Sequence, residues 1–191
     1  MSRLLESIAR VRGALLGAEA EIAPELPPRL ESLVEAFGLS PFERDLLLLC
    51  AGMELDAEMP GACAGSEARR PAFPTFDLAL ATLRDSTWRA TTPDAALRRW
   101  RLIELDQRVD LTSARLRVDE RILHHLCGAD PLDERLAPYL QRVAACSWLP
   151  PGLAGRVDAL LAELVAVVEQ GVALPAVTLS SADAADAAAL A

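Results

Sequence analysis

The sequence contains no lysine and no asparagine, and all 19 of its basic residues are arginine. We interpret this as a consequence of GC-rich coding, because arginine codons are rich in G and C whereas lysine and asparagine codons are rich in A and T. The absence of lysine excludes a phosphate-binding loop of the form GxxxxGK[ST], whose lysine contacts the nucleotide phosphates. The 191 residues alone therefore do not form a Walker-type nucleotidase.

Aromatic residues and long apolar runs are also scarce. Aromatic residues make up 4% of the chain and hydrophobic residues 52%, so we expect an ordered core built mainly from Leu, Val and Ala. No apolar run approaches the roughly 20 residues of a membrane-spanning helix, and the charged N-terminus does not resemble a signal peptide. We expect a cytoplasmic protein without a membrane partner, containing one domain or one domain and part of another.

Positive charge is in deficit. The formal net charge is −9, which argues against broad electrostatic attraction to nucleic acid. The charge is uneven, because residues 84–121 contain nine arginines and seven acidic residues, a local charge of +2, while the remainder of the chain carries −11. The positive surplus of this stretch is small.

Metal ligands and catalytic motifs are sparse as well. The four cysteines form no CxxC pair, and the two histidines, His124 and His125, share the string "HHLC" with Cys127. A structural zinc site usually shows two ligand pairs at short spacing, so we predict reduced, mostly buried thiols and no metal or cofactor. No G-x-S-x-G or similar catalytic string is present. We therefore predict no catalytic residue and no enzymatic activity for this chain.

Hydrophobic periodicity predicts helices in the first part of the chain. Residues 2–16 place Leu4, Ile8, Val11 and Leu15 on one stripe. For so short a segment we favour docking on the chain's own core, and the alternative is a contact with another subunit. A Pro-rich break at 23–28 ends this helix.

Two further helices and a loop are predicted after the break. One helix covers Arg29–Phe37 and ends at Gly38. The next begins at a capping box of Ser40, Pro41 and Glu43, and its LLLLC run is apolar on every side, which is typical of a central helix. Residues 57–75 are rich in Gly, Pro and Ala and indicate an exposed loop, and a helix over Phe76–Leu83 follows.

Residues 90–105, "ATTPDAALRRWRLIEL", predict a short helix followed at once by a strand. Thr92 is the expected cap and Pro93 the first helical residue, with Leu97 and Trp100 facing inward. In the strand "RLIELD", Ile103 and Leu105 alternate against Leu102, Glu104 and Asp106. In its predicted hairpin partner "ARLRVD", Leu116 and Val118 face inward while Arg115 and Arg117 face outward. A short helix followed by a hairpin is the order of recognition helix and wing in winged-helix proteins.

The remaining segments predict a change of pattern. Asp119 is expected to cap a helix through Cys127 that Gly128 closes in the left-handed conformation. Another helix starts at Asp130-Pro131 and ends or bends at Pro138. Residues 153–170 predict an amphipathic helix, and "ALPAVTLSS" a buried strand before the helix-prone "ADAADAAALA". A strand without a return strand is incomplete, so we expect the chain to be part of something longer.

The strings "FGLSPFERDLLLLCAGMELD", "PTFDLALATL", "TPDAALRRWRLIEL" and "LTSARLRVDERILHHLCGADPLDERL" resemble the winged-helix module N-terminal to a group of bacterial AAA-type ATPases. The resemblance covers roughly residues 29–136. It implies downstream ATPase modules and, for some members, association with contractile, phage-tail-like injection systems. It also implies that the tail begins an AAA-like module, whose phosphate loop would be degenerate because it lacks the glycines and the lysine.

Together these patterns predict a mostly helical α+β fold, a winged-helix-like domain with a short β-hairpin wing, flanking helices and the start of an α/β module. We expect an N-terminal amphipathic helix and Pro-rich break at 1–28, the winged-helix-like domain at 29–147, and at 148–191 a linker, a helix and the first strand of the degenerate module.

Six arginines are candidate contacts for a partner or for nucleic acid: Arg98, Arg99, Arg101, Arg108, Arg115 and Arg117. Arginine suits phosphates and guanine edges. Helix-turn-helix proteins, however, read bases mostly from the N-terminal end of the recognition helix, which here is Pro93-Asp94. We predict a non-catalytic adaptor that contacts protein partners and the ATPase module and can oligomerise through the parent ATPase. The alternative is a DNA-binding regulator.

Overall fold

The computed structural model describes residues 1–18, 25–65, 71–106, 109–130, 136, 139 and 151–171. The chain divides into two compact units, Met1–Asp133 and Glu134–Ala191. Three predictions lie outside the described residues, namely the helix after Asp130, the strand "ALPAVTLSS" and the C-terminal helix.

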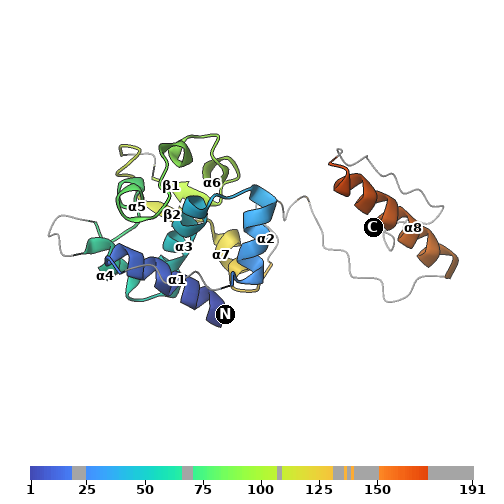
Figure 1. Ribbon diagram of the computed structural model, residues 1–191, viewed down its shortest axis with the longest axis horizontal. Helices are drawn as coiled ribbons and strands as arrows, with labels where there is room; N and C mark the ends of the chain where they lie inside the picture. The colour runs from blue at the N-terminus through green and yellow to red at the C-terminus, as the bar shows by residue number, and fades with distance from the viewer. Residues whose placement is uncertain are drawn as a thin grey trace. The chain divides into compact units, whose positions relative to one another are not determined.

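The core of the first unit forms around helix α3 (Pro41–Leu55), which Figure 1 shows among the other elements. The predicted capping box is confirmed: the Ser40 hydroxyl accepts from the Glu43 N–H at 3.2 Å, and Glu43 Oε2 accepts from the Ser40 N–H at 3.0 Å. The run Leu46–Leu49 is fully buried. A helix without a polar side must be covered all round, and the central position predicted for it is confirmed.

Two helices precede α3, namely α1 (Ser2–Leu15) and α2 (Pro28–Phe37). The α1 stripe of Leu4, Ile8, Val11 and Leu15 is buried, and α1 packs against α3. Docking on the chain's own core is therefore confirmed. The second helix ends at Gly38, which has the left-handed φ of 62°.

An ion pair between two largely buried side chains ties α1 to α3. Arg10 donates to both carboxylate oxygens of Asp45, at 2.7 and 3.2 Å, and the two side chains are only 14% and 11% exposed. Arg12 donates to Asp56 at 2.7 Å near the other end of α3. Two bonds in parallel from one guanidinium set the orientation of the helix as well as holding it.

The exposed loop predicted at 57–75 is wrong in part, because it contains helix α4 (Met59–Ala64). Met59, Ala62 and Cys63 are buried, and their i, i+3, i+4 spacing is the apolar face of a helix. The prediction of a loop relied on the Gly and Pro content of the segment and overlooked this helical spacing. Pro60 is compatible with a helix here because it lies in the first turn, where its missing N–H is not needed.

Three short helices lead into the hairpin. They are α5 (Phe76–Thr82), η1 (Trp88–Thr91) and α6 (Ala96–Arg99). The prediction for the first is confirmed to within a residue, and the Thr75 hydroxyl caps it by accepting from the Leu78 N–H at 3.0 Å.

The predicted start of the helix at Thr92-Pro93 is wrong. Thr92 follows the last residue of η1, and its hydroxyl donates to the Arg89 carbonyl at 2.8 Å. The helix α6 begins only after Ala95, whose backbone is extended. Because the Thr92 hydroxyl is engaged with the preceding turn, Thr92 terminates one helix rather than starting the next.

The hairpin consists of β1 (Ile103–Leu105) and β2 (Leu116–Val118), paired antiparallel with Glu104 opposite Arg117. On its outer side, β2 is tied to the segment before α5, because the Leu116 N–H donates to the Pro74 carbonyl at 2.9 Å. Leu102 was predicted on the outer face with Glu104, but it is 1% exposed. It precedes the strand, so the two-residue alternation does not apply to it.

Helix α7 (Glu120–Leu126) closes the first unit. Its predicted cap is confirmed, since Asp119 accepts from the Arg121 N–H at 2.9 Å, and Gly128 has the predicted left-handed φ, 97°. In the second unit, α8 (Pro151–Glu169) confirms the helix predicted at 153–170. None of the described helices is long and apolar enough to cross a bilayer.

Gly52 allows α1 and α4 to approach α3 closely. A Cβ placed there would lie 2.4 Å from Met59 Cε and 3.0 Å from Ile8 Cγ2, and both side chains are fully buried. We expect Gly52→Ala to destabilise the protein by about 1–2 kcal/mol, since overpacking outweighs the gain in helix propensity. Gly13→Ala in α1 meets only ordinary contact and should stabilise by about 0.5 kcal/mol. Urea unfolding measures both, and equal effects of the two changes would contradict this packing.

The thiols of Cys50 and Cys63 are buried in the core. Burial raises the pKa of Cys63 to about 11 and also raises that of Cys50. We expect iodoacetamide at pH 8 to alkylate Cys127, which is half-buried, well before these two, because alkylation requires the thiolate. Mass spectrometry of native and denatured protein measures the order. Loss of the difference in denaturant is the control, and equal rates in the native protein would show that the α3–α4 packing opens readily.

Candidate interaction face beside the hairpin

The turn from α6 into β1 is a Schellman motif with an arginine in the position that favours glycine. The Leu102 N–H donates to the Leu97 carbonyl at 2.9 Å and the Arg101 N–H to the Arg98 carbonyl at 3.1 Å, the two bonds that define this motif. Leu97 and Leu102 are both buried and supply its apolar contact. Arg101 has a φ of 53°, a conformation that costs an L-residue roughly 1–2 kcal/mol.

The other two arginines of α6 differ in their surroundings. Arg98 donates from Nη1 to the Thr91 carbonyl at the end of η1. Arg99 lies over the Trp100 ring, 5.2 Å from its centroid. The Arg98 guanidinium is therefore less available to an outside partner than the sequence predicts, whereas Arg99 remains exposed.

Trp100 does not face inward as predicted, since it is 51% exposed. Its ring lies against Phe37 of α2, with 5.7 Å between centroids. The four-residue α6 ends before Trp100, so the i, i+3 spacing that would place it beside the buried Leu97 does not hold. Trp88 in η1 is also exposed, at 60%. Two exposed tryptophans therefore stand before and after α6 in the sequence.

The arginines of the hairpin lie opposite acidic residues of β1 and its end. Arg117 lies directly opposite Glu104, and the Asp106 N–H donates to the Arg115 carbonyl at 3.1 Å in the next pair. Arg115 also lies over the Phe73 ring at 5.5 Å, and its Nε is buried without a hydrogen-bond partner in the described part of the chain. Arg108, the sixth candidate, is outside the described residues.

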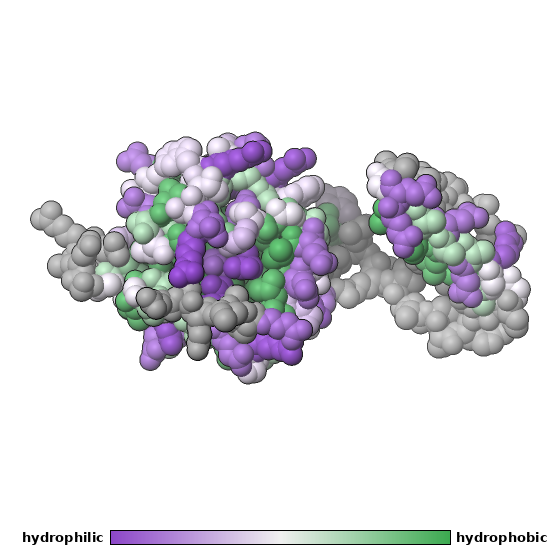
Figure 2. All heavy atoms as spheres, viewed as in Figure 1, coloured by the Kyte–Doolittle hydropathy of each residue, from purple (hydrophilic) through white to green (hydrophobic). Residues whose placement is uncertain are grey.

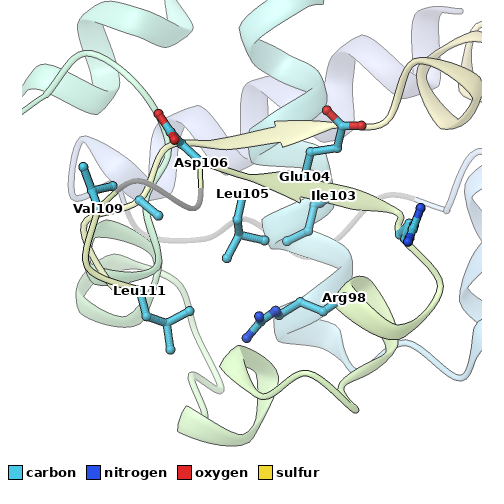
Figure 3. Close-up of a pocket in the computed structure, with 9 residues that line it drawn as sticks. Arg98, Ile103, Glu104, Leu105, Asp106, Val109 and Leu111 are labelled. Atoms are coloured by element: carbon cyan, nitrogen blue, oxygen red, sulfur yellow. The ribbon is translucent and has the colours of Figure 1, made fainter.

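A hollow of about 610 Å³ lies beside β1. Figure 3 shows Leu105, Leu111 and Arg98 bordering it, with Glu104 and Asp106 on the opposite side of the strand from Leu105. Its lining contains every residue of β1 and no residue of β2: Arg98, Arg101, Ile103, Glu104, Leu105, Asp106, Val109, Leu111 and Ala114. The lining therefore combines aliphatic side chains with two arginines and two acidic residues.

The sequence did not indicate the residues Val109, Leu111 and Ala114 as part of a site. They lie between the two strands, where no periodicity applies. Val109 and Leu111 are 53% and 38% exposed, and two exposed aliphatic residues in a short connection were the only available signal. Figure 2 shows hydrophilic and hydrophobic residues interspersed over the visible face of this unit.

The histidine pair belongs to a different cluster. His125 Nδ1 lies 2.7 Å from Asp130 Oδ1, and Arg29 of α2 donates to the same carboxylate at 2.8 Å. The bond from Arg29, followed by that from His125, lowers the pKa of Asp130. His124 lies 3.4 Å from Glu120 on the helix surface. His125 thus helps to hold α7 against α2, a role that the sequence did not reveal because Arg29 is far away along the chain.

Arg101→Gly tests whether the arginine is required by the turn. We expect this change to stabilise the protein by about 0.5–1 kcal/mol, because glycine adopts the left-handed conformation without strain but loses more entropy on folding. The matched control is Arg99→Gly, at a residue with helical geometry, which should destabilise by about 1 kcal/mol. Thermal unfolding distinguishes them. Destabilisation by Arg101→Gly as large as that by Arg99→Gly would mean that the Arg101 side chain supports the fold.

The order of elements α5, η1, α6, β1, β2 is that of a helix-turn-helix followed by a wing. No curated protein and no solved structure matches the chain. A protein-family model described as "Winged helix domain, variant" matches residues 9–140, more than half of the chain. This match confirms the predicted α+β winged-helix fold, and the chain belongs to the family of variant winged helix domains.

Proposed function

We propose that this chain is a non-catalytic interaction domain that binds a protein partner on the face formed by η1, α6 and the hairpin. The observation that carries this proposal is a hollow with aliphatic walls beside β1, next to Arg98, whose guanidinium is bonded to the Thr91 carbonyl. Exposed tryptophan and arginine side chains are enriched at protein interfaces, which fits Trp88 and Trp100 next to them.

The size and charge of α6 argue against insertion into a DNA groove. Four residues of helix extend about 6 Å, half the width of the roughly 12 Å major groove. The segment leading into this helix carries Asp94, whose pKa is lowered by hydrogen bonding at Thr92 and at its own backbone and by the charges of Arg89 and Arg99. A charged carboxylate at this end repels the phosphates that a recognition helix must approach.

The resemblance of the sequence to the N-terminal modules of AAA-type ATPases supports a finer proposal. In that context the domain would position a protein substrate or partner for ATPase modules outside these 191 residues. Oligomerisation would come through the parent ATPase, in the cytoplasm. The absence of lysine, and hence of a Walker-type phosphate loop, supports a role without ATP hydrolysis for the chain itself.

The alternative function, a DNA-binding regulator, draws on one observation. Arg117 and Arg101 are both exposed and lie on the hairpin and on the turn leading into it, within the stretch of local positive charge. The pairing of Arg117 with Glu104 across the hairpin weighs against it, because an arginine already facing a carboxylate releases few counterions from DNA.

A salt-dependent titration of fluorescent duplex DNA distinguishes the two functions. Non-specific DNA-binding proteins bind with Kd of about 10⁻⁴–10⁻⁶ M in about 150 mM salt, so a titration to roughly tens of micromolar protein would reveal binding of that strength. We expect no saturable binding in this range. Tight binding would overturn the proposal if the logarithm of the association constant falls steeply with the logarithm of salt concentration and if Arg98→Glu and Arg101→Glu abolish the binding.

A further inference from the structure

We propose that helix α8 pairs with α8 of a second copy of this chain in an antiparallel arrangement, along a seam formed by Leu153, Val157, Leu160, Leu164 and Val167. This inference goes beyond the proposed function, since it concerns the second unit and not the face beside the hairpin. The pairing is a property of the 191 residues themselves, in addition to any oligomerisation through the parent ATPase.

Helix α8 is rich in aliphatic side chains that remain accessible. Of the described residues 152–169 of this helix, none is buried, and Leu161, Val165 and Val168 are 53%, 56% and 57% exposed. The apolar stripe of α1, in contrast, is at most 8% exposed. An apolar helical stripe contributes stability only when another surface covers it, and a contiguous exposed one marks an interaction site.

The spacing of the seam residues is that of paired helices. They recur at intervals of four, three, four and three residues, and all five are half-buried. This is heptad spacing, in which the side chains of one helix insert between those of the facing helix. The 19 residues of α8 extend roughly 28 Å, which accommodates two full heptads.

The two edges of the seam differ in chemistry, and the difference selects an antiparallel pair. One edge carries Ala154, Leu161 and Val168, and the other carries Arg156 and Glu163. In an antiparallel pair each edge meets the same edge of the second copy, so two-fold symmetry brings Arg156 to Glu163 twice and Ala154 to Leu161 twice. In a parallel pair the charged edge would face the aliphatic edge, and neither charge would meet its opposite.

The remaining charges of α8 also favour a second copy over a lipid surface. The helix has one basic residue, Arg156, against three acidic residues, Asp158, Glu163 and Glu169. Helices that lie on membranes usually carry basic residues on the polar side. Asp158 and Glu169 lie on the outer side of the helix, away from the seam, so they do not oppose each other across the pair.

Sedimentation equilibrium of the full 191-residue chain, from about 1 μM to about 1 mM, tests the pairing. We expect a monomer–dimer equilibrium whose dimer has twice the 20.5 kDa mass of one chain. Leu160→Glu should raise the dissociation constant of the dimer at least about a hundredfold, because each dimer loses two buried leucines and gains two charges in the seam. Ala162→Glu places the same charge on the outer side of α8 and should change the constant by less than about threefold.

Charge variants test the antiparallel orientation. Arg156→Glu alone and Glu163→Arg alone should each weaken the dimer about tenfold, because like charges then meet twice. The double variant should restore the affinity to within about threefold of the original. An equimolar mixture of the two single variants should form a heterodimer that is tighter than either homodimer, since opposite charges meet again in both pairs.

A monomer throughout the concentration range, or equal effects of Leu160→Glu and Ala162→Glu, would overturn the pairing. Far-ultraviolet circular dichroism verifies that both variants keep their helix content. Unchanged affinity in all charge variants would overturn the antiparallel orientation. Binding of monomers to phosphatidylglycerol vesicles, lost in Leu160→Glu, would overturn the second copy as the occupant. The DNA titration tests the proposed function separately, so the two proposals can fail independently.

Discussion

The burial of α3 is the constraint on which the rest of the first unit depends. Its four consecutive leucines are fully buried, and each fully buried leucine contributes roughly 1.5–3 kcal/mol. A helix with no polar side has to be covered from every direction, and α1, α4, α6 and β2 all pack against it. The Arg10–Asp45 pair then selects one orientation of α1 on this apolar surface, which hydrophobic contact alone would leave loosely defined.

This arrangement explains why the winged-helix elements are so short. Helix α6 contributes Leu97 to the core and little else that is buried, so four residues suffice. The hairpin is likewise three residues per strand, anchored through β2 to α3 and through the Leu116–Pro74 bond to the segment before α5. A hollow remains beside β1, next to the turn that leads from α6 into the hairpin.

Local signals predicted much of this structure. The capping box at Ser40, the cap at Asp119 and the left-handed glycines at 38 and 128 depend on neighbours within a few residues, so sequence was sufficient. The errors at α4, at Thr92 and at Trp100 arose where one local pattern competed with another. Gly and Pro content masked an apolar helix face, and a threonine–proline pair suited the end of one helix as well as the start of another.

By itself, the sequence determined most of the elements, the central helix, the α+β class and the lack of a Walker-type phosphate loop, because each of these depends on composition, on short-range periodicity or on one residue type. Only the tertiary structure decided what the arginines do. Arg98 reaches a carbonyl seven residues back, Arg101 adopts a left-handed turn, and Arg29 meets His125 and Asp130 across about a hundred positions of chain. A guanidinium can satisfy any of several acceptors, and its choice is fixed only when packing brings one of them within reach.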